Sequence, residues 1–122
     1  MDYFRQTFLI YTIERCGNLN ERLRAPKKLY SADVGIRNHL TGFCDKVAIF
    51  ENLTYLKIKQ NKPCYIYRGG LEIDFYFDET IMEAKLNKQL EGRQKTFFDN
   101  FKAKEKMILQ GLNDYLNLSF CI

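Results

Sequence analysis

The sequence predicts a small α/β domain in which helices flank a mixed central sheet, in the order αβββαβ. Apolar residues recur with a helical period over residues 45–60. Short strand-like segments with turn residues between them follow over residues 64–86. A helix-like segment at 93–104 and a compact apolar run at 107–109 complete the pattern. A meander followed by a helical crossover to a further strand is a layered α/β arrangement.

Length and composition support a single domain over residues 1–122. Hydrophobic residues make up 46% and charged residues 28% of the 122 residues, which is typical of a globular protein with one core. Aromatic residues reach 15%, which favours an aromatic-rich core or surface over disorder. The net charge of +4 is compatible with a polyanionic partner but does not require one. We divide the domain into a lead-in at 1–44, a core at 45–110 and a tail at 111–122.

The lead-in is expected to contain a strand, a loop and a short helix. Residues 7–15 are rich in β-branched and aromatic side chains, which indicates a strand or a helix running into one. Residues 16–25 carry glycine, asparagine and several charges, which is typical of a loop. A short strand is predicted at 28–32, and Asp33-Val34-Gly35 is expected to turn the chain into a short helix at 36–40.

The core begins with a helix that is predicted from Asp45 to Gln60 and ends before Pro63. At about 100° per residue, one broad apolar face is expected to hold Val47, Ile49, Phe50, Leu53, Leu56 and Ile58. Glu51 lies at the border of that face. Its carboxylate is therefore expected beside the core rather than out in the solvent.

Three strands are predicted next, at Cys64–Arg68, Leu71–Phe77 and Thr80–Leu86, with turns at Gly69-Gly70 and Asp78-Glu79. In the second strand, alternation predicts one face with Leu71, Ile73, Phe75 and Phe77 and another with Glu72, Asp74 and Tyr76. In the third strand, it predicts one face with Ile81, Glu83 and Lys85 and another with Met82, Ala84 and Leu86. If these two strands pair through their short turn, Asp74 lies across from Glu83 or Lys85.

Four residues carry the chemistry that this arrangement predicts: Glu51, Asp74, Glu83 and Lys85. Carboxylates from neighbouring strands can hold Mg²⁺ or Mn²⁺ through oxygen ligands, with water and a substrate phosphate completing the coordination. A lysine beside them can position or deprotonate the attacking water and offset the charge that develops on the phosphate. Metal-assisted hydrolysis of a phosphodiester needs these residue types. The pattern also allows a simpler interpretation, in which Glu83 and Lys85 form a solvated ladder on an edge strand.

Four segments of the chain resemble a known family, and they occur in the order that the family has. They are KKLYSADVGIRNHL at 27–40, FENLTYLKIK at 50–59, YIYRGGLEIDFYF at 65–77 and MEAKL at 82–86. From about Tyr3 to Ile108, the chain is similar to the C-terminal domain of uncharacterised prokaryotic AAA-type ATPases. That domain belongs to the PD-(D/E)xK nuclease superfamily, so the resemblance implies a restriction-endonuclease-like core.

The resemblance also implies roles for individual residues. Glu51 matches the helical acid of the family's EN motif, and Asp74 takes the place of the PD aspartate, with isoleucine instead of proline before it. Glu83 and Lys85 match the (D/E)xK pair. Glu51, Asp74 and Glu83 are thus the implied ligands of Mg²⁺ or Mn²⁺. Glu72 fits the family's pattern of a glutamate and an aspartate around a hydrophobic residue, and is expected beside Asp74 as a supporting acid.

By this resemblance the chain is expected to be a metal-dependent nuclease that hydrolyses DNA phosphodiester bonds. The alternative is a non-catalytic module that binds nucleic acid or assembles with an ATPase. The chain has no GxxxxGK[ST] phosphate loop, so it is not expected to bind ATP by that route. By the resemblance it is either an excised domain or a free-standing truncated relative, and a homodimer and an ATPase module are its candidate partners. Basic residues after the site could contact phosphates or form the solvated face of a helix: Lys88, Arg93, Lys95, Lys102, Lys104 and Lys106.

The cysteines and the N-terminal residues predict the cellular location. Cys16, Cys44, Cys64 and Cys121 form no CxxC pair, which argues against a zinc site and predicts reduced thiols. Residues 1–5 lack the basic-then-apolar layout of a signal peptide, and no apolar run reaches the ~18 residues of a transmembrane helix. We therefore expect a cytoplasmic protein that does not contact the membrane.

Overall fold

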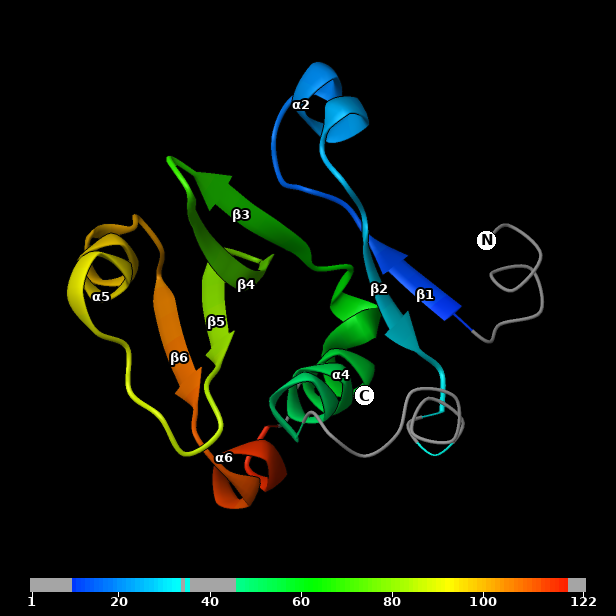
Figure 1. The fold of residues 1–122 in the computed structure, drawn as a ribbon, viewed down its shortest axis with the longest axis vertical. Coiled ribbons are helices and arrows are strands. Elements are labelled where there is room, and N and C mark those ends of the chain that lie inside the picture. Colours follow the sequence, from blue (N-terminus) through cyan, green and yellow to red (C-terminus); the bar gives the residue numbers. More distant parts are fainter. Residues whose placement is uncertain (1–9, 34, 36–45, 119–122) are drawn as a thin grey trace.

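The described part of the chain comprises residues 10–33, 35 and 46–118 of the computed structural model and contains both strands and helices (Figure 1). In chain order the elements are β1 (Ile10–Ile13), α2 (Leu19–Arg24), β2 (Lys28–Ser31), α4 (Lys46–Ile58), the 3₁₀ helix η1 (Lys59–Asn61), β3 (Cys64–Arg68), β4 (Leu71–Phe77), β5 (Thr80–Ala84), α5 (Gly92–Asn100), β6 (Glu105–Leu109) and α6 (Leu112–Leu116). Among these residues, no helix has the length and the apolar character needed to cross a membrane.

A four-stranded mixed sheet with the order β3-β4-β5-β6 is the centre of the fold. β3, β4 and β5 form an antiparallel meander, and β6 returns parallel to β5 after α5. The helices α4 and α5 lie on opposite faces of this sheet (Figure 1). The prediction of a mixed central sheet flanked by helices is therefore confirmed.

Each face of the sheet has its own apolar core. On the α4 face, Tyr55 of the helix packs in one cluster with Phe75 and Met82 of the sheet. On the α5 face, Phe98 packs in a second cluster with Ile81. Because Ile81 and Met82 are neighbours in β5 and belong to different cores, the alternation predicted for this strand is observed.

Two tight turns shape the meander. Gly69 and Gly70 have φ values of 57° and 80°, and Asp78 and Glu79 have φ values of 47° and 60°. A two-residue loop with positive φ at both positions is a type I′ turn, whose twist matches that of the strands on either side. Glycine adopts this conformation freely, whereas Asp78 and Glu79 are held in it against the steric clash of their Cβ atoms.

β4 contains a β-bulge opposite β3. Cys64 pairs with Tyr76, where the regular register set by the pair Ile66–Ile73 would require Phe75. As a result, Ile73 packs in the α5-side core and Phe75 packs in the α4-side core. The prediction of one apolar face along this strand is therefore wrong, because the extra residue reverses the alternation.

β1 and β2 form a separate antiparallel ribbon, which is joined to the sheet at β3. Arg15 and Tyr65 make a parallel bridge, and the Cys16 N–H donates to the Tyr65 carbonyl at 2.7 Å. The bridge brings Cys16 and Cys64 to a Cα–Cα distance of 5.2 Å, and the two form a disulfide. The expectation of reduced thiols is wrong for this pair, because the pairing depends on a contact between distant segments that cysteine spacing does not reveal.

The segment predicted as a loop at 16–25 contains the helix α2 instead. The Asn18 side chain accepts a hydrogen bond from the Glu21 N–H at 2.9 Å, and the Glu21 carboxylate accepts one from the Asn18 N–H at 3.0 Å. This capping box satisfies backbone donors at the start of the helix and thereby stabilises it. The short helix predicted at 36–40 and the other two cysteines lie outside the described residues.

α4 buries more polar side chains than its pattern predicts. Asn52 and Thr54 are buried, whereas Val47 is exposed, so the predicted apolar face is wrong at Val47. The Asn52 side chain accepts from the Ser31 N–H at 2.8 Å and donates to the Ser31 carbonyl at 2.9 Å. The helix is thus covered by β2 as well as by the sheet, and polar residues are buried where they bind the backbone of β2.

Candidate metal centre

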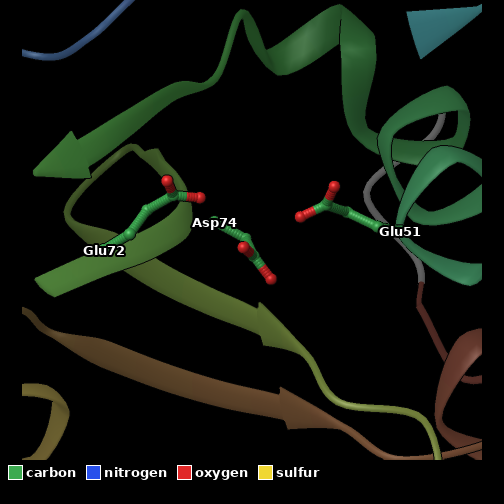
Figure 2. A group of neighbouring side chains, drawn as sticks. All are labelled: Glu51, Glu72 and Asp74. Atoms are coloured by element: carbon green, nitrogen blue, oxygen red, sulfur yellow. The ribbon is translucent and has the colours of Figure 1, made fainter. Parts of the chain in front are cut away.

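Three carboxylates from two elements converge between α4 and β4. Glu51 reaches out from α4, and Glu72 and Asp74 lie on β4 (Figure 2). One oxygen atom of each carboxylate lies within 4.8 Å of the others, which is close enough for the three to share one cation. Asp74 is buried, whereas Glu51 and Glu72 are half-buried. The cluster therefore lies at the edge of the core, where a substrate could reach it.

Glu72 and Asp74 lie on the same side of β4, as the ordinary alternation of a strand predicts. Glu72 and Asp74 flank Ile73, whose side chain packs against the opposite face of the sheet. Phe75 follows Asp74 directly, yet it packs in the core on the α4 side. Neighbouring residues share a face only where a strand is bulged, so the bulge places Phe75 on the same side of the sheet as Asp74.

Lys28 of β2 lies among the three carboxylates. Its Nζ atom is 3.3 Å from Glu51 Oε1 and 3.5 Å from Asp74 Oδ1, and it also contacts Glu72. The ammonium therefore occupies the position that a cation shared by the cluster would take. The resemblance considered above assigns no role to this lysine.

Tyr30 lies on the same strand as Lys28 and stacks on Tyr55, with ring centroids 4.5 Å apart. Its side chain is 4% exposed, and its hydroxyl lies near the Glu51 carboxylate without meeting the geometry of a regular hydrogen bond within the described residues. Burial and the nearby charge of Glu51 raise the pKa of this hydroxyl above its ordinary value. Sequence patterns did not identify Lys28 or Tyr30 as site residues. Alternation in the strand predicted at 28–32 puts them on one face, but does not reveal what that face meets.

Asp74 and Glu83 also join β4 to β5. The backbone ladder between these strands ends at the pair Phe75–Met82. Beyond it, the Asp74 N–H donates to Glu83 Oε1 at 2.9 Å, and the Ala84 N–H donates to Asp74 Oδ2 at 3.0 Å. Carboxylates thus replace backbone acceptors at the end of the ladder. Glu83, which was predicted as a metal ligand, is 3% exposed and is not one of the three clustered carboxylates.

Lys85, which was predicted to serve the attacking water, follows directly after β5. It is half-buried, and its N–H donates to the Leu109 carbonyl at 2.8 Å, which continues the pairing of β5 with β6. Its charge acts to lower the pKa of Glu83, against the larger effect of burial. In the ion pairs of the described residues, Lys28 and not Lys85 contacts the cluster.

Two carboxyl groups of the site have pKa values well above the ordinary range. Burial raises the pKa of Glu51 to about 8, with the charge of Asp74 adding to the effect and Lys28 opposing it. Burial also raises the pKa of Glu83 to about 8, again with a contribution from Asp74. Burial acts to lower the pKa of Lys28, but the charges of Asp74 and Glu51 outweigh it and raise that pKa above its ordinary value. One ammonium therefore does not neutralise the site.

The donor set fits a hard divalent cation. In the part of the chain that the structure describes, the cluster consists of carboxylates, without histidine or cysteine. Mg²⁺ and Mn²⁺ prefer such oxygen ligands and keep several waters, which leaves positions for a substrate phosphate. Because Lys28 lies at the shared position, a metal ion would have to displace its ammonium.

Comparisons with known proteins provide no relative for this fold and site. No protein-family model matches the chain, and no curated protein or solved structure matches it significantly. The function is therefore inferred from the residues and their geometry.

Proposed function

We propose that the chain is a divalent-metal-dependent nuclease domain that hydrolyses phosphodiester bonds in DNA. The convergence of the Glu51, Glu72 and Asp74 carboxylates around one cation position is the observation that carries this proposal. The element order from α4 to β6 supports it, because a PD-(D/E)xK domain has the same order. In this proposal the sheet with α4 and α5 is a restriction-endonuclease-like core, of the kind found at the C-terminus of the AAA-type ATPases that the sequence resembles.

The three carboxylates would hold Mg²⁺ or Mn²⁺ between α4 and β4. When bound, the ion would polarise a phosphoryl oxygen and lower the pKa of a coordinated water. Asp74 is oriented for this role by the hydrogen bonds that link it to Glu83 and to Ala84. Glu83 in this scheme positions Asp74 by accepting a hydrogen bond from its N–H.

Two lysines are candidates for contact with the substrate. Lys28, once displaced from the carboxylates, would remain at the edge of the site, where an ammonium can offset the charge that develops on a phosphate. Lys85, the lysine of the (D/E)xK pattern, is the candidate for positioning the attacking water. Their roles differ, so Lys28 is expected to affect metal binding and Lys85 is not.

Metal binding and DNA cleavage by the same protein test the proposal. Asp74→Asn keeps an acceptor for the Ala84 N–H and removes one ligand charge. This change is expected to weaken Mn²⁺ binding by about tenfold or more in calorimetry and to abolish cleavage of mixed DNA substrates. Glu105→Gln, an exposed acid on β6, is the matched control and is expected to change neither property. A wild-type protein that binds no Mn²⁺ and cuts no DNA would overturn the proposal.

The second candidate function is a non-catalytic module that binds nucleic acid or assembles with an ATPase. The position of Lys28 favours it, because carboxylates that surround an internal ammonium can be a purely structural network. Lys28→Met separates the two candidates, with Lys102→Met as the exposed control. A metal centre gains affinity for Mn²⁺ when the competing ammonium is removed, and Mn²⁺ then restores stability. If the network is structural, Lys28→Met lowers the free energy of unfolding by about 3 kcal/mol or more, and Mn²⁺ does not restore it.

A homodimer, an ATPase partner module and a cytoplasmic location belong to this proposal as predictions of the resemblance. The Cys16–Cys64 disulfide bears on the location, since disulfides are rare in reducing compartments. A cytoplasmic protein would therefore hold these two residues as thiols.

A further inference from the structure

A groove of about 440 Å³ opens beside the candidate metal centre. Lys28 and Glu72 belong both to that centre and to the lining of the groove. The chain between α2 and β2 lines the groove together with Tyr65 and Tyr67 of β3, and Arg15 also contributes. This volume is within the range of ligand-binding sites, about 300–1,000 Å³.

Cations line this groove outside the metal centre. They are Arg15, Arg24 and Lys27, of which Arg24 and Lys27 are exposed. In the described part of the chain Arg15 and Arg24 form no ion pair, and Lys27 makes a long one of 3.7 Å to Glu14. Cations that lack carboxylate partners attract a polyanion. The groove thus offers positive charge for a phosphate backbone beside carboxylates that could hold a metal.

Tyr67 adds an aromatic surface to the groove. Its side chain is 45% exposed, and the Arg15 guanidinium carbon lies 5.8 Å from the ring centroid. Arg15 also donates to the Tyr67 carbonyl at 2.7 Å, which fixes its guanidinium beside β3. The Tyr65 hydroxyl donates to the Pro26 carbonyl at 2.5 Å and so holds the other wall of the groove in place. An exposed ring among cations is a surface on which a base can stack.

The exposed ring distinguishes between the forms of nucleic acid. In a duplex each base is paired and is stacked between its neighbours. A protein side chain that enters the major or minor groove of the duplex therefore meets the edge of the base and not its face. In a single strand the face of a base is free, and stacking on an aromatic side chain is tolerant of sequence. Phosphate contacts alone would bind a duplex and a single strand alike. Stacking on Tyr67 favours the single strand.

We propose that this groove binds an unpaired stretch of nucleic acid that runs toward the candidate metal centre. A base stacks on Tyr67, phosphates contact Arg24 and Lys27, and the following phosphate lies beside Lys28 and the carboxylates. The part of this inference that makes single-stranded nucleic acid the substrate rests on the proposed nuclease function. Binding in the groove itself does not require the metal.

Fluorescence anisotropy in EDTA measures binding without cleavage. The probes are a labelled oligo-dT of about 15 nucleotides, the matching oligo-rU and a duplex of equal length. We expect both single strands to bind at least tenfold more tightly than the duplex. Tyr67→Ala is expected to weaken single-strand binding by roughly five- to a hundredfold, the range for loss of one stacked base, and Tyr67→Phe to retain it. Replacing Arg24 and Lys27 by alanine is expected to reduce the salt slope of binding by about 1.4.

The matched control removes two exposed lysines from elsewhere on the chain, in Lys88→Ala with Lys102→Ala. This variant is expected to bind the single strands within twofold of wild type. Two results would rule out the groove as the binding site for single strands: a duplex that binds as tightly as the single strands, or a folded Tyr67→Ala variant that binds like wild type. The groove is also ruled out if the control weakens binding as much as the loss of Arg24 and Lys27 does. Binding with the expected pattern by a protein that neither binds Mn²⁺ nor cuts DNA would therefore reject the nuclease and keep the groove.

Discussion

Lys28 and the acids around it give the candidate centre an unequal balance of charge. One ammonium faces Glu51, Glu72 and Asp74, and Glu83 lies behind them. Solvent compensates charges poorly at such buried and half-buried positions, so the protonated carboxyl is favoured and the carboxyl pKa values rise. A divalent cation supplies the same charge without protons. Metal ions and protons are therefore expected to compete for this site.

The free energy of unfolding is expected to fall as the pH rises from about 5 to 9. The pKa values of Glu51 and Glu83 are about 8 in the folded protein, against an ordinary value of 4.5. Between these values the folded protein keeps protons that the unfolded chain has released. These carboxyls thus contribute stability that is complete below pH 4.5 and is lost as the pH rises through about 8.

Urea denaturation at about pH 5, 7 and 9 measures this dependence. Glu83→Gln keeps an acceptor for the Asp74 N–H and removes one of the two titrating groups. Its stability is therefore expected to depend less on pH than that of the wild type. If the stability of the wild type instead rises over this pH range, neighbouring positive charges stabilise the ionised carboxylates in the folded protein, and the prediction is wrong.

β4 is the element that determines where the acids lie. Its bounds and its two turns could be predicted, because alternation and turn residues are local features of the sequence. The bulge at Asp74 and Phe75 could not, since an extra residue is defined only relative to the partner strand β3. The helix α2 was missed for another reason. Glycine and charged residues suggested a loop there, although Asn18 and Glu21 have the spacing of a capping box.

The turn between β4 and β5 is expected to gain stability from residues suited to its conformation. Asp78 and Glu79 have φ values of 47° and 60°, which cost an L-residue about 1–2 kcal/mol each. Asn-Gly is the preferred pair for a type I′ turn. Asp78→Asn with Glu79→Gly is therefore expected to raise the free energy of unfolding by about 1 kcal/mol. The exposed ion pair between Glu79 and Lys104 is lost, but such pairs contribute little.

Urea and thermal unfolding measure the effect of the turn, and the Gly69-Gly70 turn provides its control. Gly70 has a φ of 80°, so Gly70→Ala places a Cβ atom in the conformation that the first change relieves. Gly70→Ala is therefore expected to lower the free energy of unfolding, whereas the change at Asp78 and Glu79 is expected to raise it. If both changes shift stability in the same direction, backbone conformation is not the cause.

The candidate centre depends on how the β1–β2 ribbon is held against the rest of the molecule. The attachments are the Arg15–Tyr65 bridge, the Cys16–Cys64 disulfide and the hydrogen bonds between Asn52 and Ser31. They join segments that are distant in sequence, and local patterns do not encode such contacts. This is why Lys28 could not be assigned to the site from the sequence. Glu51, Glu72 and Asp74 could be identified, because helical period, strand alternation and the family resemblance each depend on nearby residues.

Loss of the Cys16–Cys64 disulfide is expected to destabilise the domain by about 3–4 kcal/mol, because the bond closes a loop with a sequence separation of 48. Urea unfolding of wild type with and without dithiothreitol measures the loss. The double variant Cys16→Ser with Cys64→Ser is expected to have the stability of the reduced wild type, both with and without dithiothreitol. Replacing Cys44 and Cys121 by serine is the control and should leave the response to dithiothreitol intact. If reduction leaves the unfolding midpoint of wild type unchanged, hydrogen bonds and packing alone hold the ribbon, and Lys28 keeps its place among the carboxylates in a reducing compartment as well.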